Sequence, residues 1–269
     1  MAPIRPIPLI DGVLYDKAVT ILINYPAGKS DTSFVIPNSV TTLGEGAFAF
    51  CTSLTSITIP TSVTSIEPGA FVFCTSLTSI EIPKSVTSIN YDAFFGCTQL
   101  MQVEDGVLYV DKWAIGSDEN ATSVSLRTDT VGIARGAFRD CDSLISITIP
   151  EGVTGIGYGV FYNCENLISV TIPASVTSIG NSAFYNCENL ISVTIPASVT
   201  SIDSQAFMGC TLLTSVIFAE TSGWVITDHW NGGNKVSVSA SDLSNPATAA
   251  EYLTLTYSYG NYYWNRSVE

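Results

Sequence analysis

Apolar and polar residues repeat along most of the chain with a period of 23 residues. Each unit carries the motif Ala-Phe-x-x-Cys or a close variant, with its phenylalanine at positions 48, 71, 94, 138, 161, 184 and 207, so that a single gap of 44 residues interrupts the spacing. Later in each unit, as in Ser56-Ile57-Thr58-Ile59, polar and apolar residues alternate. This period of two predicts a β-strand with one buried and one wet face. Pro60 ends the strand because proline has no N–H to donate.

A single unit cannot bury its apolar side alone, so consecutive units must stack and share one core. The L-x-x-L-x-L spacing of a leucine-rich repeat, whose length is roughly 20–29 residues, is met by Leu54, Ile57 and Ile59. Val63 and Ile66 predict a second short extended segment, and Phe48 and Cys51 fit one helical turn that buries both side chains. We therefore predict a repeat solenoid: a right-handed leucine-rich-repeat coil, mostly β, with a parallel strand ladder and short helical turns.

The unit A-F-x-x-C-x-x-L-x-x-I-x-I-P-x-x-V-x-x-I resembles the BspA-like, or treponemal-type, bacterial leucine-rich repeats, and it recurs seven times over nearly the whole chain. Residues 161–179 are identical to residues 184–202, which indicates a recent duplication. The resemblance implies a secreted or cell-surface bacterial protein with a role in adhesion and virulence. The partners it implies are host matrix proteins, host cell-surface proteins or other bacterial surfaces.

Two interruptions of the repeat share the phrase Asp-Gly-Val-Leu-Tyr, at 11–15 and at 105–109. Apolar segments flank Asp111-Lys112, which predicts a hairpin, so we expect β-hairpin islands near 11–33 and 105–122 inside a solenoid that covers 1–218. The repeat resumes through Ile36-Pro37 and through Leu126-Arg127. Only Leu9 and Ile10 precede the first island, so we expect the chain to begin in mid-repeat, as a fragment of a longer protein with an upstream export signal.

Residues 219–269 lose the repeat and are rich in aromatic residues. Asn245-Pro246 predicts a capped helix start, and Val236 and Val238 predict a short strand before it. A solenoid needs its open end covered, because an exposed strand edge recruits other chains. We therefore predict a C-terminal capping segment over 219–269. The alternative is a glycan-binding surface made by the three tryptophans of this segment, which are Trp224, Trp230 and Trp264.

The charge narrows the class of partner. The chain has 24 acidic and 10 basic residues, a net charge of -14, which would repel nucleic acid and an anionic membrane surface. No apolar run approaches the about 20 residues needed to span a bilayer, and no signal peptide opens the sequence. We expect a monomer.

The sequence offers little that could catalyse a reaction, so we predict no catalytic residue, no cofactor and no metal. The cysteines all occupy one repeat position and lack metal-ligand spacing, which predicts buried free thiols: Cys51, Cys74, Cys97, Cys141, Cys164, Cys187 and Cys210. His229, the only histidine, lies in the segment predicted to cap the solenoid, and we expect a structural role for it. The glycines between Gly152 and Gly159 lack the order of a phosphate-binding loop and match ordinary repeat positions.

The outward strand positions are the candidate binding residues, on the inner face of the arc where partners of leucine-rich repeats dock. The first row comprises Ser56, Ser79, Gln102, Ser146, Ser169, Ser192 and Ser215, and the second comprises Thr58, Glu81, Glu104, Thr148, Thr171, Thr194 and Ile217. These rows are rich in hydroxyls, with an acidic patch expected at Glu81 and Glu104. The hypothesis is a non-catalytic adhesin or protein-interaction module; a glycan-binding protein, a hydrolase that uses His229 and a structural spacer are the alternatives.

Overall fold

The computed structural model describes residues 8–118, 120–228, 233–256 and 262–267. The chain divides into two compact units. The N-terminal unit comprises Met1–Val103 and Tyr109–Ile115, and the C-terminal unit comprises Glu104–Leu108 and Gly116–Glu269. The division thus falls within the second hairpin, and the boundary expected at 218/219 lies inside the C-terminal unit.

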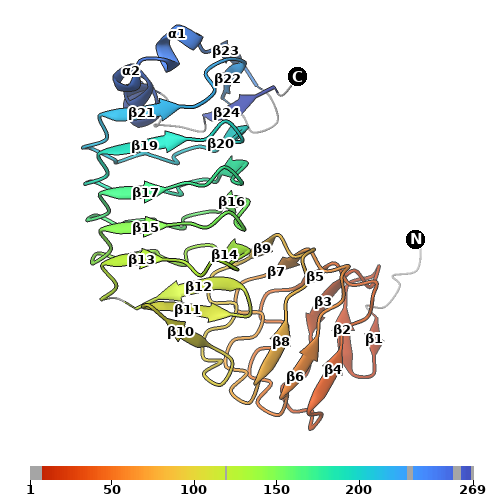
Figure 1. Cartoon of the computed structure of the whole chain (residues 1–269). Helices are drawn as coiled ribbons and strands as arrows, with labels where there is room; N and C mark the ends of the chain where they lie inside the picture. The colour runs from red at the N-terminus through yellow and green to blue at the C-terminus, as the bar shows by residue number, and fades with distance from the viewer. Residues whose placement is uncertain (1–7, 119, 229–232, 257–261, 268–269) are drawn as a thin grey trace, which may run out of the picture. The chain divides into compact units, whose positions relative to one another are not determined.

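The N-terminal unit is built on two strand ladders (Figure 1). The first ladder is a parallel sheet in the order β4-β6-β8, with β4 at Ser33–Val35, β6 at Ser56–Thr58 and β8 at Ser79–Glu81. The second ladder has the order β1-β2-β3-β5-β7-β9, with β1 at Leu9–Ile10, β2 at Val13–Tyr15, β3 at Ile21–Asn24, β5 at Thr42–Leu43, β7 at Ser65–Ile66 and β9 at Ser88–Ile89. Its first three strands are antiparallel and form the first predicted hairpin island, and β3 then continues into the parallel part.

Between the two ladders lies a core in which each repeat contributes the same side chains. Phe48, Phe71 and Phe94 are fully buried and stack with ring centroids 5.1 Å apart. Tyr25 begins this column, 5.4 Å from Phe48, although it lies outside the motif. Val63 and Ile66 are buried as predicted. The ring spacing follows the distance of about 4.8 Å between neighbouring strands, so the repeat length fixes the stacking.

The segment around each core phenylalanine is a run of linked β-turns in the place of the predicted helical turn. Ala47, Ala49 and Cys51 donate their backbone N–H groups to the carbonyl three residues earlier, whereas Phe48 and Phe50 donate theirs to the next coil. In a helix, the N–H groups beyond the first turn bind carbonyls of their own segment, but here alternate donors bind the neighbouring repeat. The i, i+3 spacing that buries Phe48 and Cys51 is common to both structures, and both residues are buried as expected.

The second hairpin island follows the N-terminal repeats. Strands β10 (Gln102–Glu104), β11 (Val107–Val110) and β12 (Trp113–Ser117) are consecutive neighbours in one sheet. The turn between β11 and β12 is the predicted Asp111-Lys112, and Asp111 has a φ of 52°. Its carboxylate accepts the backbone N–H of Ile82 at 3.0 Å. This bond replaces the carbonyl that a further strand would offer, as Thr58 does for Ile36 in the first coil.

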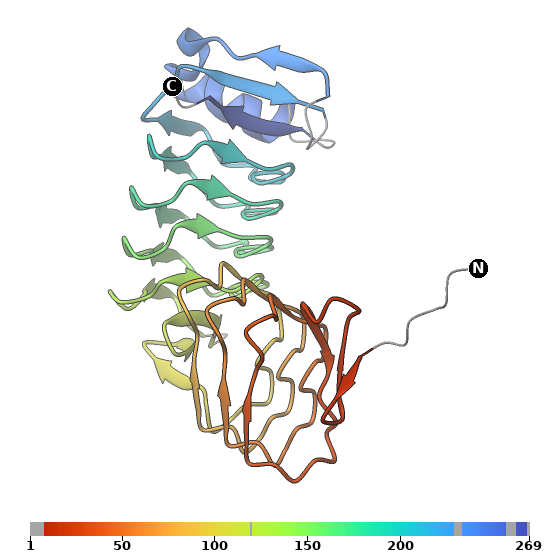
Figure 2. The same ribbon diagram turned by 90° about the vertical axis from the view of Figure 1, so that its right-hand side faces the viewer.

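The C-terminal unit repeats the same two ladders (Figures 1 and 2). Its first ladder contains the parallel strands β13 (Ser123–Ser125), β15 (Ser146–Thr148) and β17 (Ser169–Thr171), followed by the pair β19 (Ser192–Ile195) and β21 (Ser215–Phe218). Its second ladder contains the parallel strands β16 (Gly155–Ile156), β18 (Ser178–Ile179) and β20 (Ser201–Ile202), while β14 (Gly132–Ile133) contacts β16 but belongs to the sheet of β10, β11 and β12. The core column of Phe138, Phe161, Phe184 and Phe207 stacks at 5.1 to 5.5 Å.

The C-terminal segment adds antiparallel strands to the end of the second ladder. The sheet continues from β20 through β24 (Tyr263–Arg266) and β22 (Trp224–Thr227) to β23 (Lys235–Ser237). Helices α1 (Ala240–Leu243) and α2 (Pro246–Glu251) and the π-helix η1 (Tyr252–Thr256) follow β23 in sequence, and α2 packs on β21. The side chain of Asn245 accepts the N–H groups of Ala247 and Thr248, which confirms the predicted helix start. Both ladders of this unit are thus covered at their C-terminal ends.

Candidate functional site

The outward rows of the N-terminal unit lie in register on its first ladder. Ser33, Ser56 and Ser79 pair along one row, and Val35, Thr58 and Glu81 pair along the next. Thr58 and Glu81 are exposed, and Ile57 between the rows is buried. The alternation along each strand therefore places the apolar side chain in the core and its polar neighbour in solvent.

The outward rows of the C-terminal unit are longer. Their register partners are Ser123, Ser146 and Ser169 beside Ser125, Thr148 and Thr171, and then Ser192 and Ser215 beside Thr194 and Ile217. Every second-row side chain here is exposed, whereas Ser146 and Ser215 of the first row are half-buried. Ser123 and Ser146 share a hydroxyl hydrogen bond of 2.9 Å, so the rows are linked laterally as well as through the backbone.

Gln102 and Glu104 depart from the predicted rows. Both are exposed, but they lie on β10, which belongs to the sheet with β11 and not to the ladder of Glu81. Glu104 instead lies 3.9 Å from Nη1 of Arg127, whose charge offsets its own. The expected acidic patch of Glu81 and Glu104 is therefore not formed within one ladder, because the hairpin island interrupts the repeat at this point.

Four row positions were missed by the sequence analysis: Ser33, Val35, Ser123 and Ser125. They have no Ala-Phe-x-x-Cys motif before them, since each follows a hairpin island. The signal was nonetheless present, because Ile36-Pro37 repeats the strand end Ile59-Pro60, and Leu126 lies 23 residues before Ile149 of Ile149-Pro150. Counting back from these positions would have found the extra strands.

A second set of outward side chains lies two residues after each core phenylalanine, and we call it the turn column. Its members are Phe50, Phe73 and Gly96 in the N-terminal unit and Asp140, Asn163, Asn186 and Gly209 in the C-terminal unit. All have a left-handed backbone, with φ between 55° and 82°. Glycine and asparagine recur at this position, which was a usable but overlooked sequence signal for a left-handed turn.

In the N-terminal unit the turn column is aromatic and exposed. Phe50 and Phe73 are stacked with ring centroids 5.3 Å apart, and Phe95 meets Phe73 edge-on at 5.4 Å. The exposed fractions are 57% for Phe50, 38% for Phe73 and 57% for Phe95. A Cβ at Gly96 would collide with the Phe73 ring, so the glycine makes the room in which that ring lies.

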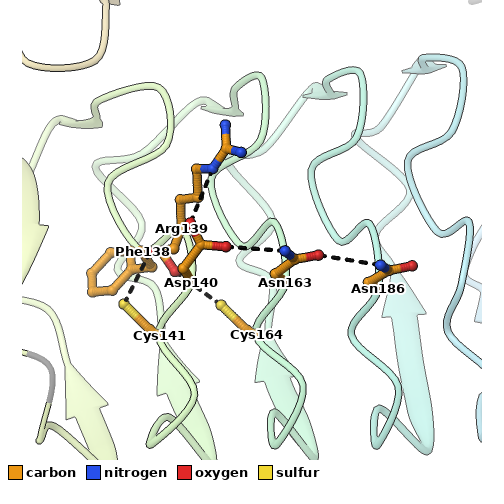
Figure 3. A network of polar contacts seen from close by, with 7 residues as sticks. All are labelled: Phe138, Arg139, Asp140, Cys141, Asn163, Cys164 and Asn186. Atoms are coloured by element: carbon orange, nitrogen blue, oxygen red, sulfur yellow. Dashed lines mark hydrogen bonds and ion pairs between the residues drawn. The ribbon is translucent and has the colours of Figure 1, made fainter.

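In the C-terminal unit the turn column is a polar ladder (Figure 3). Asn163 donates from Nδ2 to Oδ1 of Asp140 at 3.0 Å, and Asn186 donates to Oδ1 of Asn163 at 3.2 Å. Arg139 binds Asp140 at 3.2 Å, and its guanidinium lies 4.5 Å from the centroid of the Tyr162 ring. The same backbone position thus carries two different chemistries in the two units.

The cysteines lie on the inner side of these turns. The thiol of Cys164 donates to the carbonyl of Phe138 at 2.9 Å, and Cys187 donates to Phe161 at 3.1 Å (Figure 3 shows the first of these bonds). All seven cysteines are free thiols and six are buried, as predicted; Cys141 is half-buried. Burial raises the pKa of the Cys141 thiol to about 11. These groups therefore act as small apolar residues with one satisfied donor.

Trp224 and Trp264 of the C-terminal segment are too buried to form the exposed aromatic surface on which a sugar could stack. Trp224 and Trp264 are 2% exposed and pack edge-to-face, with Phe218 against both. Their rings are therefore not available to stack on a sugar. Trp230 and His229 lie outside the described residues.

Within the described ranges, no group of three or more histidine, cysteine or acidic side chains is placed to hold a metal ion. In the same part of the chain, none of the helices combines the length and the apolar character that crossing a bilayer demands.

The stacked ladders, the repeated core columns and the outward hydroxyl rows define a leucine-rich-repeat solenoid. A model of the BspA-type leucine-rich repeat region matches residues 27–115 and 110–227, in six copies. The chain belongs to this family. A search of the curated proteins finds no match.

Several solved structures are similar to the chain. The pneumococcal vaccine antigen PcpA is 22% identical, with a TM-score of 0.47 over 71% of this chain and 51% of its own. A leucine-rich cell surface protein from Faecalibacterium prausnitzii is 29% identical, with a TM-score of 0.41 over 77% of this chain and 63% of its own. The T. pallidum leucine-rich repeat protein TpLRR is 27% identical, with a TM-score of 0.34 over 72% of this chain and 82% of its own. The chain therefore spans about half of the PcpA structure.

Proposed function

We propose that the protein is a non-catalytic binding protein, secreted or on the bacterial cell surface, that acts as an adhesin or protein-interaction module. The observation that carries the proposal is the pair of outward rows on the first ladders, where exposed side chains stand in register on a rigid backbone. A backbone held by parallel ladders loses little conformational entropy on binding, which favours association. The family and the cell-surface protein from Faecalibacterium prausnitzii support the location.

The chemistry of the rows favours a weak contact that gains strength by repetition. Serine and threonine offer hydrogen bonds but little apolar area, whereas tight interfaces usually depend on Trp, Tyr or Arg. Several copies displayed on one surface would raise the overall affinity without any new contact. We infer that the partners are host matrix or cell-surface proteins, or other bacterial surfaces.

The absence of catalysis is part of the proposal and has a physical support. The thiols are the most nucleophilic type of side chain in the described residues, and only the thiolate form attacks. Six of the seven cysteines are buried, and thiols such as those of Cys164 and Cys187 donate to backbone carbonyls of the core, so they are shielded from any substrate.

The test is binding of the purified chain to immobilised matrix proteins by interferometry. Thr58→Lys and Thr171→Lys place a long side chain on the exposed row of each unit and should abolish saturable binding. Thr64→Lys and Thr177→Lys make the same change at exposed threonines outside the first ladders, and should leave binding unchanged. If all four variants bind as well as the parent chain, the outward rows are not the binding surface.

A further inference from the structure

The turn column of the N-terminal unit has a chemistry that folding does not explain. Phe50 and Phe73 have φ values of 59° and 55°, a conformation that bulky side chains rarely adopt and that asparagine, aspartate and glycine tolerate. The equivalent residues in the C-terminal unit are of those tolerant types, namely Asp140, Asn163, Asn186 and Gly209. Two phenyl rings are thus held in solvent, against the preference of their backbone.

The same turns carry negative charge and no positive charge. The segments 44–51, 67–74 and 90–97 contain Glu45, Glu67 and Asp92 but neither lysine nor arginine. Tyr91, which is also exposed, adds a further ring to these turns. Aromatic rings and carboxylates together attract a guanidinium, which stacks on a ring and forms hydrogen bonds to carboxylates in one plane.

The C-terminal unit contains an example in which an arginine of the chain itself binds both an aromatic ring and a carboxylate. Arg139 and Tyr162 each lie one residue after a core phenylalanine, at the position just before the turn column, with the guanidinium of Arg139 over the ring of Tyr162 and its Nε bonded to Asp140. Tyr162 in turn stacks on Tyr185 with centroids 4.8 Å apart, so the arginine covers the end of an aromatic column.

The turn column of the N-terminal unit lies one residue further along each coil than Arg139 and Tyr162 do, and its outer end has different neighbours. The residue 23 positions before Phe50 is Ala27, whose methyl group cannot cover the ring. Lys29, in the same coil, already binds Asp31 at 3.2 Å and the carbonyl of Asp11 at 2.8 Å. Phe50 therefore ends its column with an exposed ring.

We propose that this surface, formed by Phe50, Phe73 and Phe95 with the carboxylates of the same turns, binds an arginine-bearing segment of a partner protein. The guanidinium lies on the outer ring of the column, in the manner of Arg139 on Tyr162, and the ring edges of Phe73 and Phe95 contact the apolar residues that flank the arginine. This second surface is independent of the rows on the first ladder. A second copy of the chain is disfavoured as the occupant, because it would bring the same carboxylates face to face.

The test uses the full chain and a short synthetic peptide in which arginine alternates with leucine, with binding measured by calorimetry at physiological salt. Phe50→Asn with Phe73→Asn removes both rings at constant charge and should weaken binding at least tenfold. The double variant should fold, since Asn163 and Asn186 occupy the same turn position, and circular dichroism verifies this. A peptide with lysine in place of arginine should bind at least threefold more weakly, because an ammonium does not stack as a guanidinium does.

A charge-matched control separates this surface from general attraction to an acidic protein. Glu45→Gln, Glu67→Gln and Asp92→Asn together should weaken binding about fivefold, whereas Asp142→Asn, Glu165→Gln and Glu188→Gln in the C-terminal unit should leave it unchanged. The proposal is overturned if the Phe50/Phe73 variant binds the arginine peptide as tightly as the parent chain, if the two charge variants are equally affected, or if neither peptide binds. Self-association of the parent chain that disappears with the two phenylalanines would also overturn it in favour of a second copy.

Discussion

The N-terminal and C-terminal units have the same kind of core, each built on its own column of phenylalanines, and they differ at the turn column. The core rings Phe48 and Phe71 are 5.1 Å apart in one unit, and Phe161 and Phe184 are 5.1 Å apart in the other. The turn position has the same left-handed backbone in both, yet apart from one glycine in each unit it carries phenylalanine in the first and aspartate or asparagine in the second. The core columns therefore fix the backbone, and the turn column is where the repeat varies its surface chemistry. Each phenylalanine in that conformation costs about 1–2 kcal/mol relative to an extended backbone, so its presence points to a role outside folding.

The largest effect should come from the feature that the units share. Phe71→Ala and Phe161→Ala each remove a fully buried ring that is stacked on both sides. We expect each to lower the free energy of unfolding by about 3–5 kcal/mol, measured by urea denaturation. A loss below about 1 kcal/mol in one unit alone would show that the two cores are not equivalent.

The C-terminal unit should be the more sensitive to changes in its terminal strands. Trp264 is buried on β24, which lies between β20 and β22, and Trp264→Ala should cost about 3 kcal/mol. Hydrogen exchange should then become faster in β20 and β22, with no change in the N-terminal unit. Asn265→Ala, an exposed position on the same strand, is the control and should have little effect.

The polar ladder of the C-terminal unit should contribute less than the core. Asn163→Ala removes both amide hydrogen bonds and places a Cβ-bearing residue without a polar side chain at a φ of 58°, so we expect a loss of about 1–2 kcal/mol. Asn163→Gly removes the same bonds but relieves the backbone, and thermal unfolding should show a smaller loss. Equal losses would indicate that only the hydrogen bonds matter.

The aromatic column should matter least to stability. Phe50→Asn loses one ring stack, worth about 0.5–1.5 kcal/mol, and gains a tolerant backbone residue, worth a similar amount. We expect unfolding midpoints that differ little from those of the parent chain. A large destabilisation would mean that the rings serve folding after all, and would remove the contrast between the two units.

Acid should weaken the first hairpin of the N-terminal unit. The backbone N–H groups of Ile21 and Thr20 bind the carboxylate of Asp16 and lower its pKa. A carboxylate with a depressed pKa stabilises the folded state above its unfolded value of about 3.9, and this contribution is lost as the pH falls through the folded value. The melting temperature should therefore decrease as the pH is lowered beyond about pH 4. Asp16→Asn should make this dependence of melting temperature on pH less steep. An unchanged dependence would assign the acid effect to other carboxylates.

The sequence was sufficient to predict the strand ladders and the core, because a constant spacing of 23 residues places equivalent side chains of successive coils in contact. It was insufficient where one spacing fits two structures, as with Phe48 and Cys51, which three residues separate in a β-turn as in a helix. Gln102 and Glu104 were misplaced because the hairpin that follows them takes β10 out of the repeating ladder. The turn column was recognised from its φ angles, because Phe50 and Phe73 give no sign of their own backbone conformation and only the asparagines and glycines at the equivalent positions do.

The exact identity of residues 161–179 and 184–202 has a consequence for how long the protein can be. Because β17 and β19 belong to coils of the same sequence and the same core, recombination between the two copies inserts or deletes a whole number of codons and leaves every remaining contact intact. The terminal strands would still close the ladder, since they meet the same β20 edge whatever the count of coils before it. A lineage could thus alter the length of this solenoid in steps of one strand spacing, without passing through a misfolded intermediate.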